Sequence, residues 1–184
     1  MAMRGAQFRT AKERGEWAEA RFVARAAELM FRVAKPWGDS APYDLMVERE
    51  GLIYRLQVKS TMRRMKGCSF PCTMPSGKRL TNILKEIDFV AAYVIMLDLW
   101  YIIPAAVVQK RKGHIWLAPL RRRSKYERYL EAWHLLRRWR GGEYSRTRDA
   151  ERDTGYRLPL FAQEMRGKLG IRAMDRELRA AGQV

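Results

Sequence analysis

Hydrophobic and polar residues alternate along two neighbouring stretches of the chain, residues 43–49 and 52–60. A period of two is typical of β-strands that bury one face. The faces expected to be buried carry Tyr43, Leu45 and Val47 in the first stretch and Leu52, Tyr54, Leu56 and Val58 in the second. The opposite faces carry Asp44, Met46 and Glu48 in the first stretch and Ile53, Arg55, Gln57 and Lys59 in the second. The pattern therefore predicts two strands, each with one face in the core.

The loop between these strands sets their expected register. If residues 50–51 form a two-residue hairpin loop, Asp44 lies opposite Gln57 with the two Cβ atoms about 5 Å apart. Lys59 then projects from the same face, two residues further along the strand. A bulge or a loop of odd length would break this register.

A helix is expected over residues 10–30. Thr10 and Glu13 form a capping box ahead of it. Glu16 falls in the middle of an apolar stripe at helical spacing, whose other members are Ala20, Val23, Ala27 and Met30. A buried carboxylate is costly unless it is paired, protonated or bound to a metal. We therefore expect Glu16 to be partly buried and functional, and Glu19, at the edge of the stripe, to be a solvated charge.

Residues 89–108 carry a single charge, Asp98, over about the length that spans a bilayer. Asp98 and Pro104 divide them into two runs rich in aromatic and β-branched residues, so two buried strands joined at Asp98 fit better. The start of the chain has no apolar segment typical of secretion, so we expect a cytoplasmic protein without a membrane partner. Further strands are expected at residues 31–34 and 114–119, and turns with basic loop sequence at residues 61–80.

Ser124 and Glu127 form a second capping box, which predicts a helix to about Arg140. Its large side chains at helical spacing are expected in the core or at a subunit contact: Tyr126, Tyr129, Leu130, Trp133 and Leu136. A linker and a terminal helix are expected over residues 141–157 and 160–182.

The charge of the chain is strongly positive and unevenly distributed. Lys and Arg number 37 against 20 Asp and Glu, a formal net charge of +17. Residues 110–149 hold 13 basic and 4 acidic residues, so this segment alone carries +9. A positive field of this strength attracts polyanions, chiefly nucleic acid. The side chains expected to contact DNA phosphates are Arg63, Arg64, Lys66, Arg121, Arg122, Arg123, Arg137, Arg138 and Arg140.

Composition excludes two other classes of protein. With 47% hydrophobic residues the chain is not disordered, and two cysteines cannot form a disulfide-rich scaffold. Cys68 and Cys72 have the spacing of half a zinc site, but no second Cys or His pair follows, so ordinary thiols are expected. Packing or surface roles are expected for His114 and His134.

Four residues carry the candidate chemistry: Glu16, Asp44, Gln57 and Lys59. Asp44 offers an anionic oxygen, Gln57 a neutral one, and the backbone carbonyl of Val58 lies between them, and such oxygens suit Mg²⁺. A bound Mg²⁺ lowers the pKa of a water and stabilises charge on a phosphodiester. Lys59 can stabilise that charge or act as a base, and Glu16 can hold the lysine, a water or a second metal. The alternative is an ordinary solvent-facing side of a strand.

These residues resemble the motif of the PD-(D/E)xK nuclease superfamily, in particular its group I intron homing endonucleases and, more distantly, Holliday-junction resolvases. The resemblance covers residues 13–108, and its matching segments are residues 14–19, 42–45, 57–60, 87–93 and 101–104. It implies an α/β fold with a central mixed β-sheet flanked by helices, the restriction-endonuclease-like core. We expect this nuclease core over residues 1–120 and a basic helical C-terminal extension over residues 121–184.

The resemblance implies Mg²⁺-dependent cleavage of double-stranded DNA that leaves 5′ phosphates, with Mn²⁺ able to replace Mg²⁺. In it, Asp44 matches the metal-binding aspartate, Lys59 the catalytic lysine and Glu16 the first-helix glutamate. Gln57 stands at a position usually held by Asp or Glu, a departure that the intron-nuclease branch tolerates.

Three functions follow from this resemblance. The first is a site-specific homing endonuclease, acting as a homodimer or homotetramer because symmetry lets a small subunit read a long site. The second is a Holliday-junction resolvase. The third is a catalytically silent DNA-binding or scaffold protein, for which Gln57 is the main argument.

Overall fold

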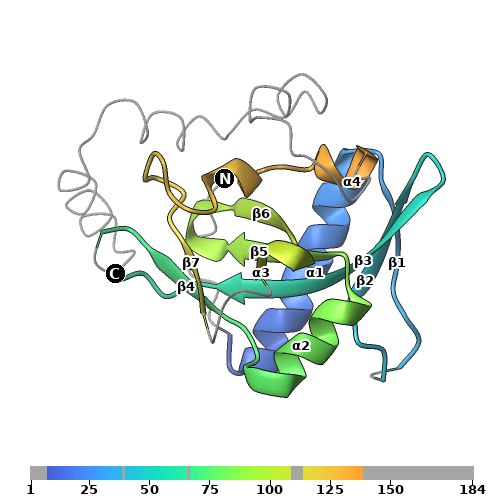
Figure 1. Cartoon of the computed structure of the whole chain (residues 1–184), viewed down its shortest axis with the longest axis horizontal. Coiled ribbons are helices and arrows are strands. Elements are labelled where there is room, and N and C mark those ends of the chain that lie inside the picture. The colour runs from blue at the N-terminus through green and yellow to red at the C-terminus, as the bar shows by residue number, and fades with distance from the viewer. Residues whose placement is uncertain (1–7, 39, 66, 109–113, 139–184) are drawn as a thin grey trace.

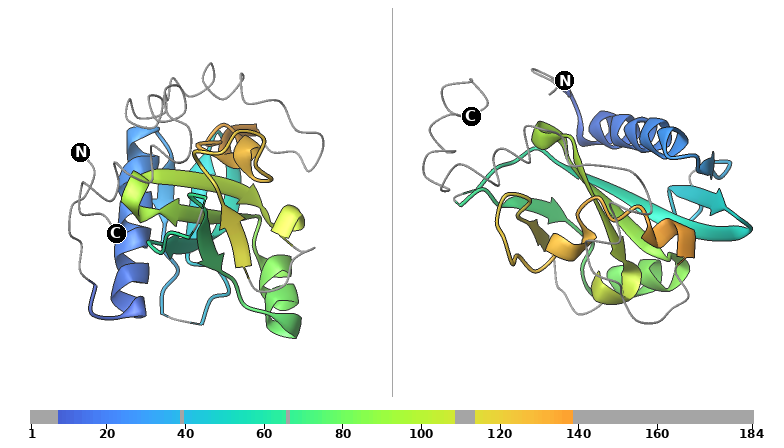
Figure 2. Two further views of the ribbon diagram at one scale, coloured as in Figure 1. Left: turned by 90° about the vertical axis from the view of Figure 1, so that its left-hand side faces the viewer. Right: turned by 90° about the horizontal axis from the view of Figure 1, so that it is seen from above.

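Five strands form one mixed sheet in the computed structural model of the chain, which describes residues 8–38, 40–65, 67–108 and 114–138 (Figure 1). Their spatial order is β1-β2-β3-β5-β6, with bounds Arg32–Ala34, Leu45–Arg49, Leu52–Thr61, Phe89–Val94 and Leu99–Pro104. β3 and β5 are parallel, and the other neighbouring pairs are antiparallel. Helix α1, Ala11–Glu28, and helix α2, Gly77–Glu86, lie on opposite sides of the sheet (Figure 2). The expected α/β fold with a mixed central sheet is confirmed.

The β2–β3 hairpin has the register that the alternating pattern predicts. Arg49 pairs with Leu52 across the turn. Glu50 and Gly51 both have positive φ, 54° and 78°, as a two-residue type I′ turn requires. One face of the hairpin is buried, as expected, through Leu45, Val47, Tyr54, Leu56 and Val58.

α1 begins where the capping box predicts, because Thr10 Oγ1 accepts a hydrogen bond from the Glu13 N–H at 3.0 Å. Its buried face is not the stripe that the sequence predicts. The buried residues are Ala18, Phe22 and Ala26, whereas the expected stripe faces outward, with Met30 77% exposed. The ring of Phe22 packs 5.2 Å from the rings of Trp100 and Trp133. Burying this aromatic surface stabilises the fold more than burying alanine methyl groups would.

A separate two-stranded antiparallel sheet is formed by β4, Phe70–Thr73, and β7, His114–Leu117. β7 confirms the strand expected at that position. β4 and α2 correct the expectation that residues 61–80 hold turns and basic loop sequence. A strand as short as β4 shows little periodicity of its own, and the strand that pairs with it lies far along the chain.

β5 and β6 are the two strands expected within residues 89–108, and both are buried throughout. They are joined by a short 3-10 helix, η1 (Ile95–Leu97), and by Asp98, which takes φ 50°. The Asp98 carboxylate accepts hydrogen bonds from the Tyr93 hydroxyl and from Arg21. α3, Ala105–Val108, follows β6. In the part of the chain that the structure describes, no helix has the length and apolar character needed to cross a membrane.

The prediction of a continuous helix after Ser124 is wrong. The chain instead forms a 3-10 turn, η2 (Glu127–Tyr129), and a short helix, α4 (Leu135–Arg138). Between them Glu131 takes φ 50°, and its N–H donates to the Trp100 carbonyl oxygen at 2.8 Å. Its carboxylate accepts the Trp100 N–H at 2.6 Å. β6 is an edge strand, so these bonds satisfy backbone groups that a continuous helix would leave unpaired.

The large side chains of this segment belong to the core, as expected, although no continuous helix carries them. All are buried in the same cluster as the sheet: Tyr126, Tyr129, Leu130, Trp133 and Leu136. The domain boundary at residue 120 stays a prediction. The linker and terminal helix expected over residues 141–157 and 160–182 lie outside the described residues.

Candidate active site

Asp44 directly precedes β2, at the point beyond which β3 has no paired strand on that side among the described residues. β2 begins at Leu45, which pairs with Leu56, whereas β3 continues to Thr61. The Asp44 N–H donates to the Leu56 carbonyl oxygen at 2.8 Å. Asp44 Oδ2 accepts a hydrogen bond from the Val58 N–H at 2.6 Å. The carboxylate thus takes the place of the missing strand beside β3.

The backbone of Val58 presents a further oxygen to this edge. In a β-strand, the N–H and C=O of one residue point towards the same neighbouring strand. Because the Val58 N–H points at Asp44, the Val58 carbonyl oxygen faces the same unpaired edge. The structure therefore brings two of the three expected metal ligands to one edge of β3.

Gln57 contacts Asp44 as the predicted register implies, with Nε2 donating to Asp44 Oδ1 at 2.9 Å. An ionised carboxylate only accepts hydrogen bonds, so the amide nitrogen faces Asp44 and Oε1 points away. Gln57 is 9% exposed, and its Oε1 is buried without a hydrogen-bond partner among the described residues. A buried acceptor without a donor is costly, and a cation would satisfy it.

These oxygens fit a hard divalent cation. The Asp44 carboxylate keeps lone pairs beyond its two hydrogen bonds, and the oxygens of Gln57 and Val58 are also of the kind that Mg²⁺ and Mn²⁺ accept. To share one ion with Asp44, the Gln57 amide would have to turn its Oε1 towards the carboxylate. Across the described ranges, no three His, Cys, Asp or Glu side chains come close enough to hold a metal by themselves. The fit therefore depends on the amide and backbone oxygens.

An acidic depression of about 320 Å³ opens beside Asp44, between α1 and the segment before β2. Its charged walls are Glu16, Glu19 and Asp44 together with Lys12 and Lys35. Lys35 Nζ lies 2.7 Å from Glu19 Oε2. The hydrogen bond and charge of Glu19, helped by the charges of Glu16 and Asp44, raise the pKa of Lys35. Lys35 is thus the counter-charge of this acidic group.

Glu16 and Glu19 of α1 have the opposite burial from that expected of them. Glu16 is not buried: its side chain is 59% exposed and pairs with Lys12 at 3.9 Å. Glu19, expected as a solvated charge, is only 20% exposed. Around the helix axis Glu19 lies about 60° from Phe22, and Glu16 about 120°. A helix face centred on Phe22 would have predicted that Glu19 is the more buried glutamate, whereas the stripe through Ala20 and Val23 pointed to Glu16.

Lys59 follows Gln57 by two residues on the same face of β3, but it lines a second depression. We call this the basic depression, and its walls are Lys59, Thr73, Met74, Pro75, Ser76 and Arg79. Three of the four expected catalytic residues are therefore divided between two depressions, and Gln57 is in the wall of neither. Asp44 contacts Gln57 and shares the acidic depression with Glu16, whereas Lys59 lines the basic one.

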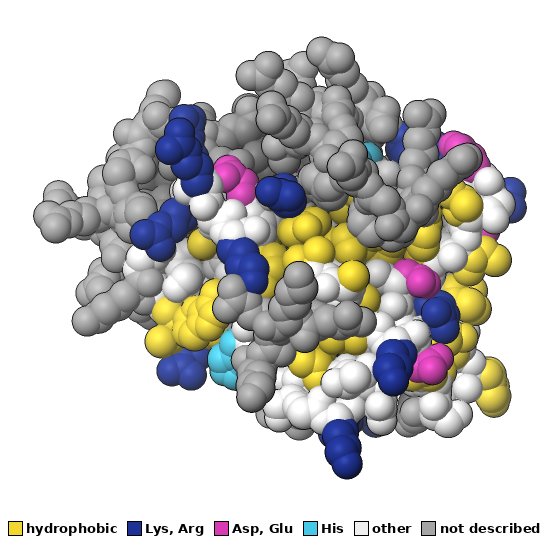
Figure 3. Space-filling model, viewed as in Figure 1, with side chains coloured by type: hydrophobic (Ala, Val, Ile, Leu, Met, Phe, Trp, Pro, Cys, Tyr) yellow, Lys and Arg dark blue, Asp and Glu magenta, His cyan; other side chains and the backbone are white. Residues whose placement is uncertain are grey.

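The residues expected to contact DNA lie mostly at the surface where the structure describes them. The exposed ones are Arg63, Arg121, Arg122 and Arg123, and Arg64 is half-buried. Arg137 is half-buried and packs over the ring of Phe31, 5.9 Å from its centroid. Figure 3 shows Lys and Arg side chains around a hydrophobic region on one face. Three of the expected positions lie outside the described part: Lys66, Arg140 and the side chain of Arg138.

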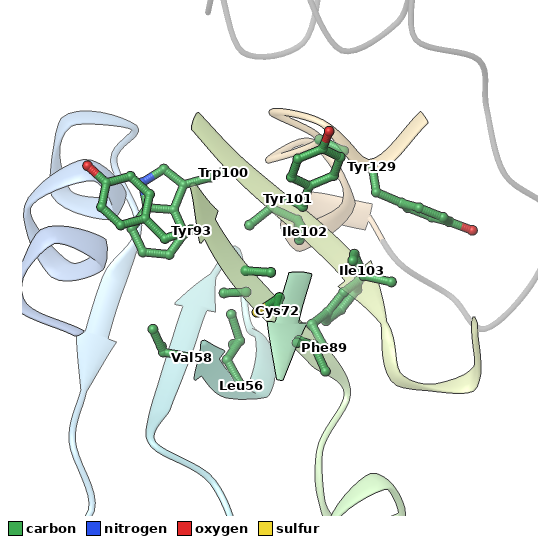
Figure 4. Close-up of a cluster of buried hydrophobic side chains, with 14 of the residues drawn as sticks. Leu56, Val58, Cys72, Phe89, Tyr93, Trp100, Tyr101, Ile102, Ile103 and Tyr129 are labelled. Carbon is green, nitrogen blue, oxygen red and sulfur yellow. The ribbon is translucent and has the colours of Figure 1, made fainter. Parts of the chain in front are cut away.

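Both cysteines are buried and neither forms a disulfide. Figure 4 shows Cys72 among the side chains of the core. Burial raises the pKa of the Cys72 thiol to about 12, against the opposing charges of Lys59 and Arg14. The burial of both thiols is typical of packing groups. One histidine is exposed and one buried, in the surface and packing roles expected of His114 and His134.

The chain is similar to known proteins in sequence and in fold. A family model described as PD-(D/E)XK endonuclease matches residues 9–136. The structure of the bacterial homing endonuclease I-Ssp6803I shares 31% sequence identity and a TM-score of 0.60, covering 69% of this chain and 91% of that one. The Holliday junction resolvase Hjc from Archaeoglobus fulgidus shares 14% identity and a TM-score of 0.48, covering 72% and 99%. No curated protein matches the chain in sequence.

The mixed sheet, with Asp44 and Gln57 in contact beside the unpaired edge of β3, defines a restriction-endonuclease-like α/β protein. The chain belongs to the PD-(D/E)XK endonuclease family. The resemblance seen over residues 13–108 is confirmed, and the family match extends it to residue 136.

Proposed function

We propose that the chain is a divalent-metal-dependent endonuclease that hydrolyses phosphodiester bonds in double-stranded DNA. The arrangement of Asp44 carries this proposal, because its carboxylate joins Gln57 and the Val58 N–H at the unpaired edge of β3. The buried, unsatisfied Oε1 of Gln57 at the same place supports a cation. Membership of an endonuclease family supports the reaction class.

Each residue has a separate role in this proposal. Asp44, Gln57 Oε1 and the Val58 carbonyl oxygen would hold the metal. When bound, Mg²⁺, or Mn²⁺ in its place, supplies a Lewis acid that stabilises charge on the phosphodiester and lowers the pKa of a water. Lys59 would stabilise the negative charge that develops on the phosphate oxygens. Glu19 would orient the attacking water and accept its proton. The water oxygen bonds to phosphorus as the bond from phosphorus to the 3′ oxygen breaks, and the 3′ oxygen takes up a proton from solvent water.

Within this class, a site-specific enzyme of the homing type is our preferred interpretation. Its support is the 31% identity with a bacterial homing endonuclease over 69% of the chain. We further propose a homodimer or homotetramer, because symmetry doubles the length of DNA that a small subunit reads. The charge of +9 over residues 110–149 would supply attraction to the DNA backbone.

The test uses the full chain and two kinds of DNA. A plasmid library with random inserts is incubated with Mg²⁺, Mn²⁺ or EDTA, and the ends of any linear product are sequenced. A synthetic four-way junction of arbitrary sequence is treated in parallel. The expected result is cleavage of linear or plasmid duplex at a defined sequence, with 5′ phosphate ends, in either metal but not in EDTA.

Two results would overturn parts of this proposal. Metal-dependent cleavage confined to the four-way junction would replace the homing type with a resolvase. Absence of cleavage of every DNA in both metals would leave a silent DNA-binding or scaffold protein, the alternative that Gln57 suggests. Sedimentation velocity in the same buffer tests the proposed homodimer or homotetramer. An enzyme that cuts duplex DNA while sedimenting as a monomer on it would contradict that proposal.

A further inference from the structure

The basic depression brings together two cationic side chains, from β3 and from α2. Lys59 from β3 and Arg79 from the first turn of α2 line it, in a volume of about 470 Å³. Neither side chain forms an ion pair with a carboxylate in the described part of the chain. Glu19 and Lys35, near the candidate site, differ in this respect because they neutralise each other.

A third cation strengthens the same positive region. The positive charges of Arg14, in α1, and of Lys59 both act to lower the pKa of the Cys72 thiol. Cys72 directly precedes Thr73, which lines the basic depression. Arg14 Nε is buried and has no hydrogen-bond partner among the residues that are described. Arg79 is exposed, whereas Arg14 and Lys59 are half-buried. Partly desolvated, unpaired charges such as the latter two are costly, so an anion bound between them and Arg79 would stabilise this arrangement.

The anion that fits is a phosphodiester of the substrate backbone. Arginine binds phosphate with two parallel hydrogen bonds, whereas lysine acts as a point charge, and this depression offers one of each. Ser76, at the N-cap of α2, makes no side-chain cap hydrogen bond, so first-turn N–H groups add to the positive field that the side chains set.

We propose that Arg79 binds a backbone phosphate next to the phosphodiester that is cut, and so positions the DNA strand across the site. The proposal rests on the proposed nuclease function. Lys59 connects the two places, because it lines the basic depression with Arg79 and follows Gln57 by two residues on one face of β3. Arg79 is a positioning residue, and it belongs neither to the acidic depression nor to the metal ligands.

The experiment compares three variants of the full chain. Arg79→Gln removes the charge, and Arg79→Lys keeps it. Lys78→Gln is the matched control, since Lys78 is exposed in the same turn of α2 but does not line the depression. Binding to a 30-base-pair duplex labelled with fluorescein is measured by anisotropy at several salt concentrations in Ca²⁺. Single-turnover cleavage of plasmid DNA in Mg²⁺ is measured over a range of protein concentrations.

For Arg79→Gln, we expect affinity at low salt to fall about tenfold, and the slope of log K against log salt to decrease by about 0.9. The protein concentration for half-maximal cleavage should rise more than the maximal rate falls. Arg79→Lys should restore the salt slope, because it keeps the charge, but only part of the affinity, because it loses the paired hydrogen bonds; a merely structural role of Arg79 would not predict recovery of the slope. Lys78→Gln should keep the salt slope of the wild type.

Equal slopes for Arg79→Gln and Lys78→Gln would overturn the inference, and so would failure of Arg79→Lys to recover the salt slope in a folded variant. The binding measurements that give the salt slopes do not require cleavage. A wild-type chain that binds but cuts no DNA would therefore refute the proposed function, while the slopes would still decide the role of Arg79.

Discussion

Gln57 Nε2 and Asp44 Oδ1 lie 2.9 Å apart, and this single hydrogen bond sets the direction of the whole amide. Because an ionised carboxylate cannot donate, the nitrogen of Gln57 faces Asp44 and Oε1 faces away. A glutamate here would place a second negative charge against Asp44. The glutamine instead holds Asp44 in place and still has one oxygen to offer to a cation.

Replacing Asp44 with asparagine removes the charge and nearly preserves the shape. We expect Asp44→Asn to lower cleavage by about a thousandfold, roughly 4 kcal/mol in the activation barrier. The Val58 N–H still finds an acceptor, so the melting temperature should change little. Single-turnover cleavage in Mg²⁺, with DNA binding in Ca²⁺ as the control, measures this. Cleavage at nearly the wild-type rate would remove Asp44 from the site.

Gln57→Glu tests the role of the amide. Without metal, two carboxylates in contact repel each other, so the variant should melt a few degrees below wild type in EDTA at pH 7.5. Mg²⁺ should then raise its melting temperature more than it raises that of wild type, because a carboxylate attracts the ion more strongly than an amide. Cleavage should be kept, at a lower metal requirement.

Gln57→Leu is the control for this prediction, since it has neither the charge nor the oxygen. It should show little Mg²⁺-dependent stabilisation and weak cleavage. An equal Mg²⁺ response in Gln57→Glu and wild type would show that residue 57 is not a ligand.

Glu19 and Glu16 form a matched pair on one helix, with side chains 20% and 59% exposed in the same depression. We expect Glu19→Gln to lower the single-turnover rate by about a hundredfold, the usual effect of removing an acid–base group. Glu16→Gln should stay within about twofold of wild type, since a mostly solvated charge contributes little. The reverse order of the two effects would restore the role that the sequence pattern assigns to Glu16.

The hairpin could be predicted from the sequence because local features decide it. The alternation on both strands and the two-residue turn at Glu50 and Gly51 agree on one register, and that register brings Asp44 to Gln57. The face of α1 could not be predicted in this way. Its many alanines allow two apolar stripes, and the choice between them depends on Phe22 meeting two tryptophans from distant segments.

The region after Ser124 shows the same limit. Capping residues and helical spacing favour a helix there. Glu131 instead has a non-helical, positive φ and forms hydrogen bonds with the backbone of Trp100 in the edge strand β6. No local pattern contains that requirement. The acidic depression is non-local in the same sense, because Glu19 and Lys35 meet only once α1 lies against the segment that follows β1.

Glu131 predicts a specific dependence of stability on pH. Burial raises its pKa to about 7, although hydrogen bonds from the Trp100 N–H and the Trp133 indole oppose this. Between about pH 4.5 and 7 the folded chain keeps a proton that the unfolded chain releases. The free energy of unfolding should therefore fall as pH rises through this window, by at most about 1.4 kcal/mol per pH unit.

Glu131→Gln should remove this component of the pH dependence. The variant should also be less stable at pH 5, because one amide oxygen cannot accept both N–H groups. Urea unfolding at pH 4.5, 6 and 7.5, compared between wild type and variant, measures both effects. Parallel curves for the two proteins would mean that Glu131 ionises at its ordinary pKa.

Arg121, Arg122 and Arg123 are expected to differ in role from Arg137. The salt dependence of DNA binding and the melting temperature should distinguish the two roles. Arg121, Arg122 and Arg123 are exposed, and none pairs with a carboxylate in the described ranges. Replacing all three with glutamine should lower the slope of log K against log salt by about 0.9 for each phosphate that is no longer neutralised, at an unchanged melting temperature. Arg137→Gln should instead lower the melting temperature, because Arg137 packs over Phe31, and leave the slope unaltered. An unchanged slope in the triple variant would make these charges a solvated face and assign DNA contact to the loop around Arg63.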